Sequence, residues 1–401
     1  MKYLLLSFVF FSTLVFAQEG VITLKPDRIL DGKGATIEGK NVIIENGKIK
    51  EVSSNTAGKV YDLKGYTLLP GVIDTHVHLD WHFDSDGKLH DAKPEEESPA
   101  QRVLYNAENA YQTLMAGVTA VQCLGAAPEG DVRDAINRGA LPGPRILTSM
   151  GAIGEWTGNA DSIRVAVNKL ADAGADVIKI FASASIRVGG TPTLSQEQLD
   201  VACGEAKERG LRTVVHAHGS ESARRAIAAG CTAIEHGSLL DKETLELLAK
   251  TGTYYDPHIG LIFDNYFAHK KNYIGAAGFT EEGFNQMEQA VGKAVATFKL
   301  ALKTRGLQIV YGTDAVAGAH GHNLEELVAR VLKGGQDPMD AIVSMSSTAA
   351  KSINLDKITG SISSGLSADI IAVKGNPLKD IRTMLDVQFV MKEGKIYKFW
   401  K

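Results

Sequence analysis

The sequence predicts an α/β protein with a (β/α)8 barrel over residues 71–355 and a small β-sandwich built from both chain ends, residues 18–70 and 356–401. Eight short apolar runs alternate with helix-like segments through the middle of the chain, and strand-like segments with turn signals occur at both ends. Polar side chains also follow five of the eight runs. An open doubly wound sheet gives these side chains no reason to meet, whereas a closed barrel does.

The first 17 residues are typical of a secretory signal peptide. Lys2 precedes an apolar stretch from Tyr3 to Phe16, and the segment ending at Ala17 resembles a signal-peptidase site. The stretch is shorter than the roughly 20 residues that span a bilayer, so a retained anchor is the less favoured alternative. We expect an exported protein, periplasmic or secreted, with no membrane contact after cleavage.

Each terminal segment contains a turn between two strand-like runs, Asn46-Gly47 in the first and Glu393-Gly394 in the second. Two β-rich segments flanking a different pattern suggest one small domain that uses both ends.

The composition argues against a nucleic-acid partner, because the formal charge is -4 and no basic stripe occurs. We expect a small-molecule partner, and a homo-oligomer is possible. The three cysteines, Cys123, Cys203 and Cys231, lie among apolar or small residues and form no CxxC pair. An odd number in an exported chain argues against a disulfide framework, so we expect buried free thiols.

The predicted barrel strands are 68–79, 117–125, 145–151, 176–183, 212–219, 233–238, 253–260 and 308–315. Helical spacing with a Gly at the exit marks 195–210, 220–230 and 241–252. The segment 259–305 is longer than one crossover needs. It carries several aromatic residues and then a helix-like run over 280–304, so it is either a lid over the site or an ordinary packed helix.

Two histidines end the first predicted strand, in GVIDTHVHL. His76 and His78 are two residues apart, so their side chains point the same way and both imidazoles can bind one cation. Alone the pattern is weak, because histidines are common at solvent-facing strand ends.

Lys179 interrupts the apolar run VIKIF in the fourth strand. A buried unpaired ammonium is costly, and nearby cations would lower the pKa of the amine. The neutral amine could then take up CO2 and form a carbamate, a bidentate anion suited to bridging two metal ions. The structural alternative is a Lys paired with a carboxylate or reaching to the rim.

His216 and His236 end successive strands twenty residues apart, about one strand–helix–strand repeat. His218 lies on the same strand side as His216 and competes for the ligand role. We favour His216, which directly follows RTVV, and this leaves His218 as a substrate-pocket candidate. The structural alternative for these residues is a hydrogen-bonded rim histidine.

Asp314 follows the eighth run, in IVYGTDA. It would bind one metal and a shared water whose pKa two divalent ions lower towards neutrality. Asp314 would accept the proton of that water and pass it to the leaving amine. Its structural alternative is a helix cap. Five strand ends that each carry a suitable ligand make coincidence improbable.

Together with ILDGKG, GYTLLPGVIDTH and SSGLSADIIAVKGNPL, these motifs resemble the metal-dependent amidohydrolase superfamily over essentially the whole mature chain. Within it, the chain is most similar to the imidazolonepropionase-like and prolidase-like group, which includes dipeptidases for Xaa-Pro or Xaa-basic dipeptides and amidases for N-acyl amino acids. The resemblance implies a barrel with a β-sandwich, a binuclear zinc site and an N6-carboxylated lysine. By matching motifs, it assigns one metal to His76, His78 and Asp314, the other to His216 and His236, and the bridge to Lys179.

A dipeptide or acylated amino acid ends in a carboxylate, which calls for a cation near the rim. Arg187, in the loop after the fourth strand, is the candidate for that contact. Tyr254, Tyr255 and His258, at the seventh strand, are candidates for hydrogen bonds or oxyanion stabilisation. The structural alternative is a solvated side chain for Arg187 and a packed side chain for the two tyrosines.

The sequence therefore predicts an exported binuclear zinc amidohydrolase that cleaves the amide of a dipeptide or an N-acyl amino acid. The alternatives at the same site are hydrolysis of a lactone or other ester and hydrolysis of a cyclic amide. A non-enzymatic alternative is a binding protein on an inactive barrel, and the intact ligand set argues against it.

Overall fold

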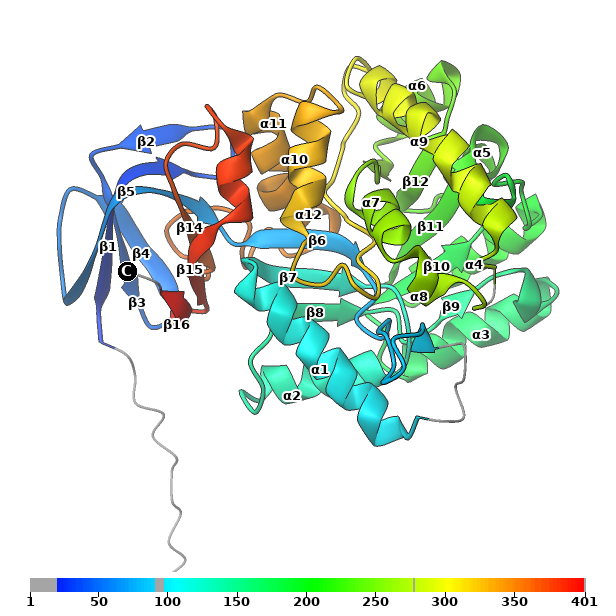
Figure 1. Ribbon diagram of the computed structural model, residues 1–401, viewed down its shortest axis with the longest axis horizontal. Coiled ribbons are helices and arrows are strands. Elements are labelled where there is room, and N and C mark those ends of the chain that lie inside the picture. The colour runs from blue at the N-terminus through cyan, green and yellow to red at the C-terminus, as the bar shows by residue number, and fades with distance from the viewer. Residues whose placement is uncertain (1–19, 91–96, 277, 400–401) are drawn as a thin grey trace, which may run out of the picture.

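The computed structural model describes residues 20–90, 97–276 and 278–399 as a mixed α/β fold (Figure 1). The predicted signal peptide, residues 1–17, lies outside the described residues. None of the described helices combines the length and the apolar character needed to cross a bilayer.

Both ends of the chain contribute to one eight-stranded mixed sheet, seen with blue and red strands together in Figure 1. Its strands are β1 (Ile22–Leu30), β2 (Thr36–Glu38), β3 (Asn41–Glu45), β4 (Lys48–Ser53), β5 (Lys59–Pro70), β14 (Ile370–Lys374), β15 (Val387–Lys392) and β16 (Lys395–Phe399). The C-terminal β14 pairs antiparallel with β5, and the strand order is β16-β15-β14-β5-β1-β3-β4, with β2 on β1. Buried residues such as Leu24, Ile29 and Phe389 form its core. The sequence thus correctly predicted that the chain ends share a sheet.

The middle of the chain forms two parallel sheets, ordered β6-β7-β8 and β13-β12-β11-β10-β9. Their strands are β6 (Val72–Val77), β7 (Val118–Cys123), β8 (Arg145–Thr148), β9 (Ala152–Ile153), β10 (Val177–Phe181), β11 (Arg212–Gly219), β12 (Ala233–Leu239) and β13 (Tyr254–Asp256). Seven of the eight predicted strands therefore contain an observed strand.

The predicted eighth strand, 308–315, lies between the two parallel sheets and makes only isolated bridges. Ile309 pairs with Tyr255 in β13, and Ala315 pairs with Val77 in β6. Asp314 has a φ of 54°, which lies outside the strand region and ends the extended backbone there. Position 312 needs glycine, because the Asp256 carboxylate lies 2.1 Å from where a Cβ would be.

Helices follow most of the central strands and cover the outer side of the parallel sheets (Figure 1). They are α1 (Pro99–Met115), α2 (Pro128–Asn137), α3 (Ala160–Asp172), α4 (Gln196–Glu208), α5 (Ser220–Ala228), α6 (Lys242–Thr251), α10 (Leu324–Leu332), α11 (Pro338–Val343) and α12 (Ala349–Ser352). The three helices predicted over 195–252 are confirmed. Ser195 and Asp241 cap the first turns of α4 and α6, and Gly252 ends α6 in the left-handed conformation.

The segment 259–305 folds as α7 (Leu261–Ala268), α8 (Lys270–Tyr273) and α9 (Glu281–Ala301). Its aromatic residues pack in a separate core with Phe279 and Tyr273 at the centre. The segment is therefore a packed helical segment, as one of the two alternatives predicted. Part of it also lines the pocket described below, and its role as a lid stays a prediction.

The prediction of three free thiols is wrong for two of the cysteines. Cys203 in α4 and Cys231 before β12 form a disulfide, with Cα atoms 5.4 Å apart. The two neighbouring strand–helix units bring together residues 28 positions apart, which the odd cysteine count did not reveal. Cys123 is buried and free, as predicted.

Candidate active site

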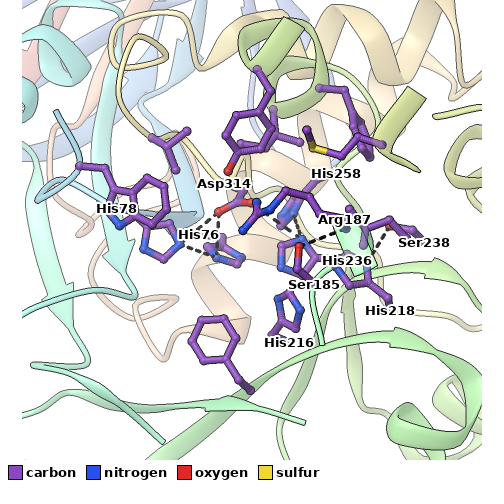
Figure 2. Close-up of a pocket in the computed structure, with 18 of the residues that line it drawn as sticks. His76, His78, Ser185, Arg187, His216, His218, His236, Ser238, His258 and Asp314 are labelled. Carbon is purple, nitrogen blue, oxygen red and sulfur yellow. Dashed lines mark hydrogen bonds and ion pairs between the residues drawn. The ribbon is translucent and has the colours of Figure 1, made fainter. Parts of the chain in front are cut away.

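The carboxyl ends of the parallel strands open into one pocket of about 180 Å³ (Figure 2). The six predicted metal ligands all line it, and we call them the pocket floor: His76, His78, Lys179, His216, His236 and Asp314. A second set of lining residues comes from the turn η4 (Ile186–Val188) and the segment 259–305, and we call it the pocket roof: Arg187, Ile262, Phe263, Tyr266 and Met287.

Three ligand atoms converge at one corner of the floor. The Nε2 atoms of His76 and His78 are 3.2 Å apart, and they lie 3.4 and 3.1 Å from Oδ1 of Asp314. A tetrahedral Zn²⁺ with bonds of about 2.1 Å holds its ligand atoms about 3.4 Å apart. The three residues therefore fit a divalent cation, and Figure 2 shows them pointing towards one another.

The other histidines form a second candidate metal group. Nitrogens of His216, His218 and His236 lie within 4.8 Å of one another. Nζ of Lys179 is 3.3 Å from Nε2 of His76, and His236 Nδ1 is 4.0 Å from Asp314 Oδ2, so the two groups are adjacent. The sequence favoured His216 over His218 as the ligand, and the structure places both in this group.

Burial favours the neutral forms of the pocket histidines and of Lys179, and the neutral forms can bind cations. Desolvation lowers the pKa values of His76, His216 and His236 well below the ordinary value, and lowers the pKa of His218 to about 3. The imidazoles are therefore neutral at pH 7, and each has a lone pair available. Burial also lowers the pKa of Lys179, although Glu235 and Asp314 oppose that shift.

Asp314 is ionised despite its burial. Desolvation raises the pKa of its carboxyl, but a hydrogen bond from His78 and the positive potential of nearby groups outweigh this and leave the pKa below its ordinary value. The side chain of Asp314 is 14% exposed, so the carboxylate faces the pocket and can accept a proton there.

Two floor residues have unusual backbone conformations. His236 has a φ of 65° and Asp314 a φ of 54°, in the left-handed region that non-glycine residues rarely adopt. The conformation is held in place by neighbours, including the Tyr255 hydroxyl, which donates to the Gly237 carbonyl. Strain of this kind concentrates at functional sites.

A buried polar network supports the floor, and it was not predicted from the sequence. Glu235 Oε2 lies 2.7 Å from Nδ1 of His76 and fixes the ring, leaving Nε2 towards Asp314. Asp256 lies 3.5 Å from His258 and 3.3 Å from the fully buried Arg330. The sequence does carry one sign of this network, because Glu235 in AIEHG and Arg330 in LVARVL are charged residues inside apolar runs.

The predicted substrate contacts divide into two groups. Arg187, His218 and His258 line the pocket. Tyr254 and Tyr255 do not line it: Tyr254 packs against Val177, Val214 and Ala233 near the starts of their strands, and Tyr255 is buried against Gly237. The reason is that β13 begins at Tyr254, so both tyrosines precede the strand end that faces the pocket.

The His258 ring lies within the histidine group rather than at its edge, because its Nδ1 is 2.9 Å from Nδ1 of His236. His218 is oriented by Ser238, whose hydroxyl is 3.2 Å from its Nδ1. Sequence reasoning also missed the apolar lining, whose members carry no motif: Trp81, Phe181, Ile186 and Val316.

A family model described as the Amidohydrolase family matches residues 67–397. Ochratoxinase from Aspergillus niger is 27% identical over 378 residues, which cover 82% of this chain and 75% of that protein. The crystal structure of a Xaa-Pro dipeptidase with bound methionine superposes with a TM-score of 0.84 at 30% identity, covering 94% of this chain and 100% of that one. The Aspergillus niger ochratoxinase structure, with a TM-score of 0.82 at 24% identity, shares the fold.

The matched region contains the whole floor of the pocket, and the metal-dependent chemistry of that family agrees with the convergence of neutral imidazoles and an ionised carboxylate. The chain belongs to the amidohydrolase family.

Proposed function

We propose that this protein is an exported, binuclear zinc amidohydrolase that cleaves the amide bond of a dipeptide or an N-acyl amino acid. The observation that carries the proposal is the meeting of six residues from five distant segments in one small pocket, with three ligand atoms 3.1–3.4 Å apart. Hydrolysis adds water across the amide: the C–N bond breaks, the carbonyl carbon gains a hydroxyl, and the nitrogen gains a proton.

The proposed architecture is a closed (β/α)8 barrel over residues 71–355 with a β-sandwich from 18–70 and 356–401. The hydrogen bonds of 308–315 support closure, since Tyr255 N donates to the Gln308 carbonyl and Thr75 N donates to the Tyr311 carbonyl. Closure would place all the strand ends around one axis and so explain why their side chains meet.

His76, His78 and Asp314 would hold one cation, and His216 and His236 the other. When bound, a pair of divalent cations lowers the pKa of water and polarises the amide carbonyl. Glu235 keeps Nδ1 of His76 occupied and so orients that ring. Asp314, ionised and facing the pocket, accepts the proton of the attacking water at its carboxylate and returns it to the leaving nitrogen.

Lys179 is proposed to bridge the two cations after carboxylation. The side chain is fully buried, and among the described residues no carboxylate oxygen lies within 4.0 Å of its Nζ. Burial favours the neutral amine, which adds CO2 at Nζ and loses a proton to give a carbamate anion. This accounts for a lysine that has no counterion in the described part of the chain.

Export is supported by the signal-like first 17 residues and by the Cys203–Cys231 disulfide, because disulfides persist mainly in oxidising compartments. Sequencing the N-terminus of protein recovered from the periplasm or medium tests this. A chain that retains residue 1 inside the cell would contradict it.

The central test is a metal determination followed by a substrate screen. We expect about two metals per chain, hydrolysis of members of a dipeptide and N-acyl amino acid library, and loss of activity on chelation. A protein that carries metal but cleaves only a matched set of lactones would contradict the amide assignment. A carefully prepared protein with no metal and no activity would favour a binding protein.

A further inference from the structure

The roof of the pocket contains a cation that has no counterion in the described chain. No carboxylate oxygen of the described residues lies within 4.0 Å of the Arg187 guanidinium, and its Nε is buried without a hydrogen-bond partner. Figure 2 shows Arg187 extending towards the middle of the pocket, where Asp314 and His236 lie.

Arg187 is also held in place before any ligand arrives. Its guanidinium lies over the Phe279 ring, 4.0 Å from the centroid, and its backbone N–H donates to Ser185 Oγ. Gly278 lies beside the guanidinium, since a Cβ there would be in ordinary contact with one of its nitrogens, at 3.4 Å. A stacked guanidinium loses little freedom on binding and presents a planar pair of donors, which matches a carboxylate.

The remaining lining is mostly apolar, with rings and aliphatic side chains from Trp81, Phe181, Ile262, Phe263 and Met287. Of the described residues that line the pocket, Asp314 is the only carboxylate, and it belongs to the floor. A lysine or arginine side chain of a substrate would find no free counterion here, whereas an apolar or aromatic one would be desolvated favourably.

We infer that the enzyme acts only on amides next to a free carboxylate, which Arg187 binds, and that it selects apolar or aromatic residues over basic ones. This inference rests on the proposed function and narrows it: of the Xaa-Pro, Xaa-basic and N-acyl amino acid classes, the basic one is excluded. The products are a free apolar amino acid and the acid of the acyl group.

The test compares matched substrates with the metal-loaded, full-length mature enzyme. N-acetyl-L-phenylalanine, its primary carboxamide and Nα-acetyl-L-lysine share the acyl group. The first two differ only in the carboxylate, and the third replaces the aromatic side chain with a basic one. We expect kcat/KM for the free acid to exceed that for the carboxamide by about 10- to 100-fold, because the carboxamide lacks the charge-assisted hydrogen bond to Arg187. We expect a similar excess over the lysine compound, because its ammonium group would be buried without a counterion.

Two variants assign the preference to Arg187. Arg187→Met should raise KM for the free acid and bring the acid-to-carboxamide ratio close to one, and Arg187→Lys should retain part of it. Arg209→Met, which removes the arginine at the C-cap of α4 that pairs with Asp172, is the matched control and should keep the wild-type ratio. Thermal unfolding of each variant shows whether it is folded.

The outcomes separate the two proposals. Three outcomes would overturn this inference while the amidohydrolase assignment stands. The wild type could hydrolyse the free acid and the carboxamide equally well, or the lysine compound as well as the phenylalanine compound. The acid-to-carboxamide ratio of kcat/KM could also stay unchanged in folded Arg187 variants. If the metal-loaded wild type hydrolyses neither these compounds nor any other amide in the screen, the proposed function fails, and the inference fails with it.

Discussion

The floor and the roof of the pocket are built in different ways. Five of the six floor residues lie in or directly after regular strands, so backbone ladders fix their direction. The roof residues come from a short turn and from helices α7 and α9, and they are held by side-chain packing such as Arg187 on Phe279. We expect the floor to determine the rate of the chemical step and the roof to determine which substrate binds.

The difference also shows in charge. The floor gathers neutral imidazoles around one ionised carboxylate, an arrangement that favours bound cations. The roof offers one cation on an apolar surface, an arrangement that favours an anion with an apolar side chain. A substitution in the floor should therefore lower kcat and metal content, and one in the roof should raise KM.

The largest effect is expected for Asp314→Asn. The amide keeps the size of the side chain but accepts a proton poorly, so kcat should fall by about 100- to 10,000-fold while the fold persists. Steady-state kinetics with metal analysis measure this. Asp264→Asn, which changes an exposed aspartate paired with Lys333, is the control and should be neutral. Wild-type turnover in Asp314→Asn would remove the residue from the mechanism.

The next largest effect is expected for Lys179→Ala. Without the bridging anion the pocket should lose metal, and activity should fall by about 100-fold, the upper range for residues that support a metal site. Added formate or acetate should restore part of the activity by replacing the carbamate oxygens.

Lys392→Ala is a matched control for Lys179→Ala. Lys392, in β15 of the mixed sheet, is also buried, but its ammonium group donates to the Gly143 carbonyl. The Lys392→Ala variant should lose stability and keep its metal. Full metal content in Lys179→Ala would contradict a bridging role and would place the lysine among ordinary buried cations.

The convergence of the floor residues on one pocket could be predicted because strand geometry is local. A His-x-His pair must point to one side of a strand, and Lys179 inside VIKIF must be buried. The supporting network was not predicted, since the contacts of Glu235 with His76 and of Asp256 with Arg330 join residues 159 and 74 positions apart. Only the fold specifies those pairs.

Two kinds of error have the same origin. Tyr254 and Tyr255 were predicted to stand at the end of the seventh run, whereas β13 begins at Tyr254, and the strand boundary decides which end of the sheet a residue faces. The disulfide was missed because the packing of α4 against α5 is a tertiary feature. The positive φ values of His236 and Asp314 were also not predicted, because histidine and aspartate adopt the left-handed region more often than most residues but still too rarely for residue type alone to locate it.

A smaller effect, after Arg187→Met, is expected for Tyr266→Phe in the roof. The Tyr266 hydroxyl lies near the Arg187 guanidinium, whose charge offsets part of the rise in the tyrosine pKa that burial causes. Removing the hydroxyl loosens a positioning contact, so KM for the free acid should rise by about 2- to 10-fold at constant kcat. Tyr111→Phe, at an exposed position on α1, should change neither constant. A fall in kcat alone would assign Tyr266 to the chemistry of the floor.

The smallest effect on turnover is expected when the disulfide is removed. Cys203→Ser releases a link between α4 and the connection that leads into β12, which carries His236, but the strand ladder still fixes that residue. The free energy of unfolding should fall by about 2–4 kcal/mol, while kcat stays within about twofold, because the link mainly constrains the unfolded chain. Denaturant titrations with and without reductant measure this, and Cys123→Ala, at the free thiol, should respond to reductant as the wild type does. If the loss of the link lowers kcat as strongly as a floor substitution, the strands alone do not hold the floor in place.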